Sequence, residues 1–421
     1  SKAKDTNISP SVLASLEIIV TEDNDDGTKS YLIDAESLFL EETFLQVKPS
    51  YGSNHGDNFR LGSLSTDKTK FSDLRNYPNN TDFVVSYVFE DSHPKSQGSK
   101  AVTDARNISV DIHHSFIAMP ENDYQPRIDD YRIGYFNQNR TDLTSTEPAP
   151  YLDMINRWNL VKKDPAAAVS DPVEPIVWWI ENTTPIEFRA SVKEGAESWN
   201  IAFEEAGFSN AVVVKQQPDD VDWDAGDIDY NVLRWTASPR PPFGGYGPSF
   251  ANPRTGQLLG ADIMLEFVYV KNRVKYEELY QPVQAEKTSH ISVDSQFCDF
   301  GNHLQENLML GITTLEIQGS SEIEITKLLN QTIKHLVLHE VGHTLGLNHN
   351  MKASQTVSLE NLHNLEWTEK HGLVGSVMDY TPINISAKGK PQGKYFADKP
   401  GSYDLWAIQF GYQPDLSEEE R

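Results

Sequence analysis

Three histidines and one glutamate stand together at spacings that suit a metal site. The segment 339–349 reads HEVGHTLGLNH, so His339 and His343 are four residues apart and lie on one face of a helix. Gly346 allows a sharp turn after the helix, and His349 can then supply a third nitrogen. Three imidazoles leave a fourth coordination position open, as in catalytic zinc sites, whereas a structural zinc is closed by a fourth protein ligand. The sequence therefore predicts one catalytic Zn²⁺ ion held by His339, His343 and His349.

Glu340 directly follows the first histidine, and its side chain is expected where a metal-bound water would sit. A carboxylate at that place can act as a general base. The five fixed positions of H-E-x-x-H-x-x-G-x-x-H arise by chance in on the order of one chain in 10⁴ of this size. The alternative is a helix with surface histidines near its C-terminus, where cations suit the helix dipole. The residues around the motif favour the metal site.

The residues before the motif predict the helix that must carry it. Ser321 and Glu324 fit the capping-box pattern at a helix N-terminus. Apolar side chains then recur at helical spacing, at Ile325, Leu328, Leu329, Ile333, Leu336, Val337 and Val341. Gly346 is expected to end the helix in a left-handed conformation.

Residues 176–270 alternate between strand and helix patterns. Strands are expected at 176–180, 211–215, 230–236 and 259–270, and a helix at 185–206. In the last strand, alternate residues share one face, namely Ala261, Ile263, Leu265, Phe267 and Tyr269. The region 271–319 fits neither pattern clearly, and a helical insertion is one interpretation of it.

The first part of the chain is expected to form strands, because it contains runs of β-branched and aromatic residues. The candidates are 16–20, 30–33, 83–89 and 108–117, with the first two joined as a hairpin. The stretch 161–175 contains three prolines and is interpreted as a connector. We therefore expect an α+β fold, with a β-rich N-terminal domain over 1–165 and a catalytic domain over 172–421.

The composition excludes several classes of function. The chain has 421 residues, with 36 Lys and Arg against 62 Asp and Glu, and a formal net charge of −26 at pH 7. This charge repels nucleic-acid phosphates and anionic lipid headgroups, so neither is an expected partner. No run of about eighteen apolar residues is present, so no membrane span is expected. The single cysteine, Cys298, excludes an internal disulfide framework and a cysteine-based zinc cage.

A second motif follows His349 by about thirty residues, where 375–382 reads GSVMDYTP. Together with the histidine motif, it resembles the metzincin zinc endopeptidases, whose zinc histidines rest above a methionine-containing turn. Met378 matches that methionine, and Tyr380 matches the tyrosine that astacin-like and serralysin-like members place near the zinc. Residues 402–412 resemble the C-terminal helix of the family.

More narrowly, the chain is similar to large bacterial exported metzincin-like peptidases with a β-rich N-terminal region of unknown role. The resemblance implies a zinc endopeptidase acting on protein or peptide substrates, with Glu340 as general base and Tyr380 as hydrogen-bond donor to the oxyanion. It implies export to the periplasm, cell surface or medium, with the signal segment absent from this chain. It also makes 259–270 the edge strand with which an extended peptide pairs.

Two other interpretations stay open. In one, the zinc site is a relic in an exported protein that binds a glycan or a protein, although the intact Glu340 argues against it. In the other, the enzyme is latent because residues 1–165 cover the cleft. Calcium is not indicated, because the loop-like stretch 22–27 is followed by Ile33 where a calcium loop has an acidic residue. The sequence predicts neither the preferred peptide nor the oligomeric state.

Overall fold

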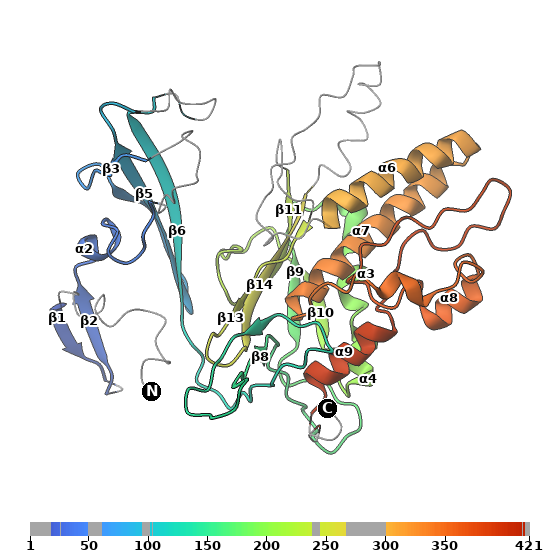
Figure 1. Ribbon diagram of the computed structural model, residues 1–421, viewed down its shortest axis with the longest axis horizontal. Coiled ribbons are helices and arrows are strands. Elements are labelled where there is room, and N and C mark those ends of the chain that lie inside the picture. The colour runs from blue at the N-terminus through green and yellow to red at the C-terminus, as the bar shows by residue number, and fades with distance from the viewer. Residues whose placement is uncertain are drawn as a thin grey trace. The chain divides into compact units, whose positions relative to one another are not determined.

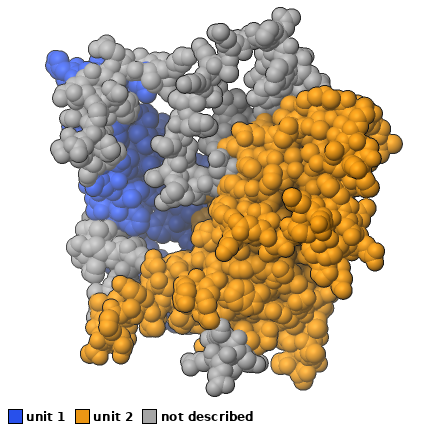
Figure 2. All heavy atoms as spheres, turned by 45° about the vertical axis from the view of Figure 1, so that its right-hand side comes forward, with its two compact units in different colours: residues 1–120 blue, residues 121–421 orange. Residues whose placement is uncertain are grey.

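The computed structural model of the chain describes residues 18–25, 27–48, 61–94, 102, 104–237, 245–266, 300–414 and 416. The chain divides into two compact units, residues 1–120 and 121–421, which are blue and orange in Figure 2. The first unit consists mainly of strands, and the second combines a mixed sheet with helices. The expected α+β class with a β-rich N-terminal region is therefore confirmed.

The N-terminal unit is built from antiparallel strands. β1 (Ile18–Asp23) and β2 (Lys29–Ile33) form the expected hairpin. A second sheet contains β3 (Ser63–Leu64), β4 (Lys70–Asn76), β5 (Asn80–Glu90) and β6 (Asn107–Ile117), and β5 pairs with the other three (Figure 1). Alternate residues of β5 are buried, and Tyr87 donates a hydrogen bond to the main chain of Phe39 in the short helix α2 (Glu36–Phe39).

The C-terminal unit contains a mixed sheet in the order β10-β9-β11-β14-β12. Its strands are β9 (Ile176–Ile180), β10 (Val212–Gln216), β11 (Asn231–Thr236), β12 (Gly245–Tyr246) and β14 (Leu258–Glu266). The four longer strands are parallel, whereas β12 and the neighbouring β13 (Ser249–Ala251) run antiparallel to β14. A separate short ladder joins β7 (Asn137–Gln138) and β8 (Met154–Ile155).

The edge of this sheet is not where the sequence predicted it. We expected the strand at 259–270 to be the edge, but β14 lies inside the sheet, between β11 and the short strands β12 and β13. The prediction was wrong because strands of two and three residues are too short to show alternation. The alternation in β14 is confirmed up to Leu265, and Phe267 and Tyr269 lie outside the described residues.

The described helices longer than one turn in the C-terminal unit are α3 (Ile186–Glu197), α4 (Asn200–Glu205), α6 (Phe300–Gln318), α7 (Glu322–Thr344), α8 (Leu365–His371) and α9 (Ser402–Tyr412). The helix expected over 185–206 is two helices, which separate at Ser198 and Trp199. Trp199 is fully buried, and its indole N–H donates to the carbonyl of Leu338 in α7 at 2.9 Å. Both α3 and α6 pack against α7 (Figure 1).

Helix α7 begins and ends as its sequence predicts. The Ser321 hydroxyl accepts a hydrogen bond from the backbone N–H of Glu324, which satisfies a donor at the helix N-terminus. Gly346 has φ +97° beyond the C-terminal end. A Cβ at that residue would also lie 2.0 Å from the carbonyl oxygen of Asn156, so both the backbone angle and the close approach require glycine.

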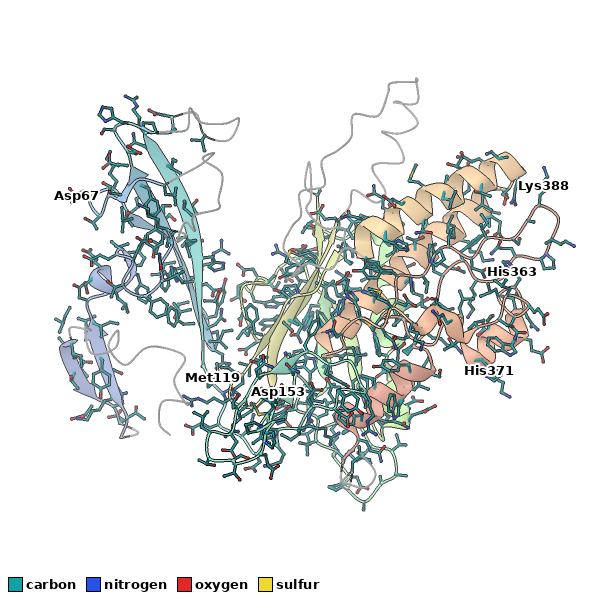
Figure 3. All side chains as sticks on the ribbon, viewed as in Figure 1. Asp67, Met119, Asp153, His363, His371 and Lys388 are labelled. Atoms are coloured by element: carbon teal, nitrogen blue, oxygen red, sulfur yellow. The ribbon has the colours of Figure 1, made fainter. Side chains whose placement is uncertain are left out.

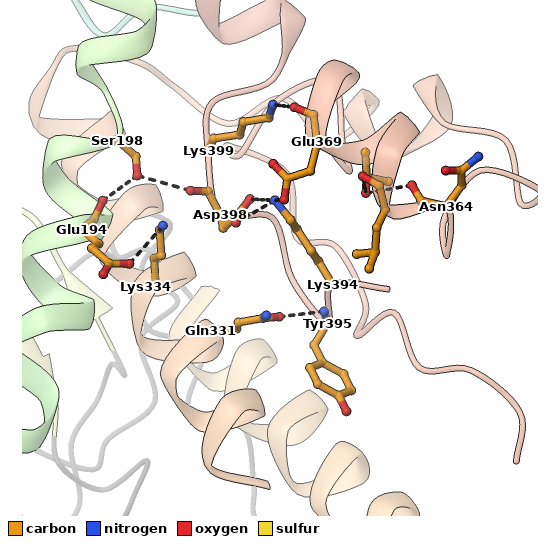
Figure 4. A network of polar contacts seen from close by, with 12 residues as sticks. Glu194, Ser198, Gln331, Lys334, Asn364, Glu369, Lys394, Tyr395, Asp398 and Lys399 are labelled. Carbon is orange, nitrogen blue, oxygen red and sulfur yellow. Dashed lines mark hydrogen bonds and ion pairs between the residues drawn. The ribbon is translucent and has the colours of Figure 1, made fainter. Parts of the chain in front are cut away.

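A polar network ties the segment 394–399 to three helices (Figure 4). Lys394 forms ion pairs of 2.8 Å with Glu369 of α8 and with Asp398. The backbone N–H of Tyr395 donates to Gln331 of α7, and the Ser198 hydroxyl beside α3 donates to the carbonyl of Asp398. The network fixes the chain that connects the second motif to α9.

The domain boundary near residue 165 stays a prediction. Residues 121–165 group with the C-terminal unit, where Tyr135 donates to the carbonyl of Ala407 and Trp158 to that of Thr344.

Of the expected insertion at 271–319, residues 300–318 form α6, and 271–299 lie outside the described residues. No helix of the described part is long and apolar enough to cross a membrane.

Candidate metal centre

The three predicted histidines converge. Each offers one ring nitrogen, and these atoms lie within 4.8 Å of one another for His339, His343 and His349. The Nε2 atoms of His343 and His349 are 3.1 Å apart. His339 is fully buried and His343 nearly so, whereas His349 is half-buried. Among the described residues, this is the one group of three or more such side chains close enough to share an ion.

Two main-chain carbonyls orient the helical histidines. Nδ1 of His339 lies 2.7 Å from the carbonyl oxygen of Val377, and Nδ1 of His343 lies 2.9 Å from that of Leu347. Because a carbonyl can only accept, each Nδ1 carries the proton and each Nε2 keeps its lone pair. This pairing of one ring nitrogen with a carbonyl is what metal-binding histidines show in general.

Burial keeps these imidazoles in the form that binds metal. Burial lowers the pKa of His339 well below its usual value and that of His343 to about 3, and the neighbouring histidines add to both effects. The pKa of His349 is lowered as well, mainly by burial. Neutral imidazoles are therefore present at neutral pH, so the donor set fits a zinc ion.

Glu340 is fully buried beside this cluster and is not part of it. Its carboxylate lies against the backbone of β12, because a Cβ on Gly245 would be 2.7 Å from Oε1 of Glu340. The edge segment of the sheet therefore runs directly past this carboxylate. The sequence did not indicate Gly245, because its requirement for glycine arises only from this contact.

Met378 is fully buried beneath α7. A Cβ on Gly342 would lie 2.3 Å from the Met378 sulfur and 2.8 Å from the Trp199 ring, so both side chains pack on the bare helix backbone between His339 and His343. The carbonyl of Met378 also accepts a hydrogen bond from the N–H of Asn350, one residue after His349. The methionine turn therefore supports the segments that carry all three histidines.

Asp404 of α9 holds this turn from the other side. Its fully buried carboxylate accepts hydrogen bonds from the Ser376 hydroxyl and from the backbone N–H groups of Val377 and Gly401. Burial raises the pKa of Asp404 to about 6, although these hydrogen bonds oppose the shift. Sequence reasoning missed this residue, because an acidic side chain in the first turn of a helix is common without any distant contact.

Tyr380 lies beside the histidines. Its ring centroid is 4.9 Å from that of His349 and 5.8 Å from that of His339. The side chain is half-buried and packs against the hydrophobic core of the C-terminal unit. Tyr380, two residues after Met378, therefore lies with its ring beside the histidine cluster.

Other histidines lie outside the cluster. His335 is fully buried between Phe300 and Phe396, with ring centroids at 5.3 and 5.5 Å. His363 precedes α8 and His371 ends it (Figure 3). Cys298 lies outside the described residues.

Comparison with known families agrees with this geometry. Residues 322–421 match the family model described as Met-zincin, and residues 1–163 match a domain of unknown function (DUF5117). No curated protein and no solved structure matches the chain. The matched C-terminal region contains the histidine cluster, the methionine turn and α9. Residues 322–421 of this chain are therefore similar to the Met-zincin family, and their three histidines fit a zinc site.

Proposed function

We propose that this chain is a zinc-dependent endopeptidase. The observation that carries the proposal is the buried carboxylate of Glu340. It lies beside the three converging imidazoles and is not itself one of the candidate ligands. A metal site that only stabilises the fold has no need of an acidic side chain that is not a ligand of the ion, and burying a carboxylate costs free energy. A hydrolytic site needs a proton acceptor at this place.

The histidine residues His339, His343 and His349 would hold the zinc ion through their ring nitrogens. A zinc ion there supplies a Lewis acid that lowers the pKa of water and polarises a carbonyl group. Glu340 takes the proton of the attacking water and passes it to the nitrogen of the leaving amine. Because Glu340 is buried, the low local dielectric constant strengthens the interaction of its carboxylate with that proton.

Tyr380 is proposed as a hydrogen-bond donor to the oxyanion that develops on the former carbonyl oxygen. Its ring lies beside those of His349 and His339, which supports this role. Such donors act in the transition state, because they meet a charge that the ground-state substrate does not yet carry.

The substrate is proposed to be an extended peptide. β12 is the last strand in the order of the described sheet, and its Gly245 lies against Glu340. A peptide that pairs with this edge would have its backbone beside the general base. In this proposal β12 and β13 form the peptide-pairing edge that we expected at 259–270.

The test is Glu340→Gln, which keeps the size of the side chain and removes its basicity. We expect zinc content to stay at the level of the parent and turnover of a fluorogenic peptide library to fall by about 10²–10⁴-fold. The matched control is Glu322→Gln, which changes an exposed glutamate at the start of the same helix. If the Glu340 variant cleaves peptides like the parent, the hydrolytic assignment is wrong.

A further inference from the structure

One face of helix α6 lies at the metal centre. Phe300, His303 and Asn307 are separated by three and four residues, which is the spacing of neighbours on a helix surface. Phe300 stacks on the ring of His339, with centroids 3.9 Å apart and planes at 16°, and it also contacts Tyr380 at 5.2 Å. Helix α6 therefore contacts both a predicted zinc ligand and the predicted oxyanion donor.

His303 and Asn307 hold the chain at and after Tyr380. The rings of His303 and Tyr380 stack, with centroids 5.8 Å apart and planes at 26°. The side-chain oxygen of Asn307 accepts a hydrogen bond from the backbone N–H of Ile383 at 2.9 Å. Its amide nitrogen lies 3.1 Å from Nε2 of His303, and this Nε2 is 3.4 Å from the carbonyl oxygen of Thr381.

Further contacts continue along α6. A Cβ on Gly311 would lie 2.4 Å from the end of the Ile383 side chain, so Ile383 packs directly on the helix backbone. Near the end of the helix, Gln318 donates to the carbonyl of Ser386 at 3.1 Å. Helix α6 thus fixes the segment 381–386 at several points.

Tyr380 is therefore anchored from both sides along the chain. Asp404 fixes Ser376 and Val377 before it, and Asn307 fixes Ile383 after it. An oxyanion donor must be held within about 0.5 Å of its productive position, and a residue on a turn reaches that precision only through such neighbours.

We propose that Asn307 is a positioning residue, supported by His303, which holds Tyr380 where its hydroxyl can donate to the oxyanion of the substrate. The inference rests on the proposed peptidase function and extends it to an element outside the histidine motif and the methionine turn. Asn307 acts through the main chain of Ile383 and the ring of His303, and it does not itself touch the reacting atoms.

The first test compares Asn307→Ala with Tyr380→Phe. Losing the phenol should lower kcat by about 10–10³-fold, and losing Asn307 should lower it by a smaller factor of about 3–30-fold. KM should change less than about twofold in both, because the interaction forms in the transition state. Zinc content should equal that of the parent. The control is Glu306→Ala, which alters an exposed neighbour on α6.

The double variant separates positioning from a general loss of structure. If Asn307 acts through Tyr380, the variant carrying both changes has nearly the kcat of Tyr380→Phe alone. Fully additive losses would overturn the proposal. His303→Ala should lower kcat as well, and His303→Phe should restore much of it, because a phenyl ring can keep the stacking on Tyr380.

Hydrogen exchange gives a readout that does not depend on activity. Asn307→Ala should speed amide exchange in the peptide covering 380–386 and leave α9 as in the parent, and unchanged exchange would overturn the proposal. A parent that binds zinc and cleaves no peptide would overturn the proposed function, together with the catalytic role of Tyr380. A parent that cleaves peptides while Asn307→Ala keeps the full kcat would overturn only the role of Asn307.

Discussion

The two units of the molecule differ in how far along the chain their essential contacts reach. In the N-terminal unit, β5 pairs with β4 and β6, its neighbours in sequence, and alternate residues of β5 supply much of the core. In the C-terminal unit, contacts around the metal centre join residues far apart in the chain, such as Trp199 with Gly342 and Asn307 with Ile383. The first arrangement follows from local pattern, whereas the second exists only after the chain has folded.

The chemistry follows the same division. The described residues of the N-terminal unit contain no group of three metal-binding side chains close enough to share an ion. The C-terminal unit gathers such a group from the end of a helix and the loop beyond it. Changes in the C-terminal unit should therefore alter zinc binding, and changes in the core of the N-terminal unit should not.

The largest effect is expected for His349→Ala. A loop supplies this ligand, so the fold should persist while zinc affinity falls on the order of 10³-fold, more than the 10–100-fold typical for a residue that only supports a ligand. Competition titration with a chelator measures the affinity. His363→Ala is the matched control, because this histidine also follows α7 and lies outside the cluster. Equal affinities of the two variants would mean that another residue completes the site.

Phe83→Ala tests the N-terminal side of the comparison. Phe83 of β5 is buried in the core of the N-terminal unit. Its ring packs edge-on against that of Phe39, with ring centroids 4.8 Å apart. Removing such a ring costs about 3–5 kcal/mol of unfolding free energy. Denaturant unfolding, monitored by the hydrogen exchange of the β5 amides, should show this loss. The control Leu74→Ala, at an exposed residue of β4, should not show it. A parallel fall in zinc affinity would show that the two units are not independent in this respect.

The smallest of the three effects is a pH dependence of the stability of the C-terminal unit. Burial lowers the pKa of His335 to about 4, whereas an unfolded histidine has a pKa of about 6.5. The unfolded state therefore binds a proton first as the pH falls, and stability is lost between about pH 6.5 and 4. A shift of this size corresponds to about 3 kcal/mol.

The variant His335→Phe should lack this part of the pH dependence, because its side chain cannot be protonated. The measurement compares the unfolding free energies of the metal-free parent and variant at pH 7 and pH 4. His339 and His343 remain in both proteins, so their own contributions cancel in the difference. Equal losses of stability in the two proteins would mean that His335 is not buried as a neutral side chain.

Much of the site was predictable because its residues are close in sequence. The histidine spacing, the cap at Ser321 and the turn at Gly346 are local features, and the structure confirms the cap and the turn. The edge strand was predicted wrongly, because β12 and β13 are shorter than any detectable period. The prediction of a single helix at 185–206 was wrong as well. The break at Trp199 goes with the packing of this side chain on α7, which no local sequence pattern indicates.

The sequence by itself determined which residues can bind zinc and which helix carries two of them, because helical periodicity places side chains four residues apart on one face. Only the tertiary structure decided what surrounds them. The Asp404 anchor, the contact of Gly245 with Glu340 and the contacts of α6 with Tyr380 join elements far apart in the chain. No local pattern records such contacts, because they depend on how the sheet and helices pack and not on any one segment's own preference.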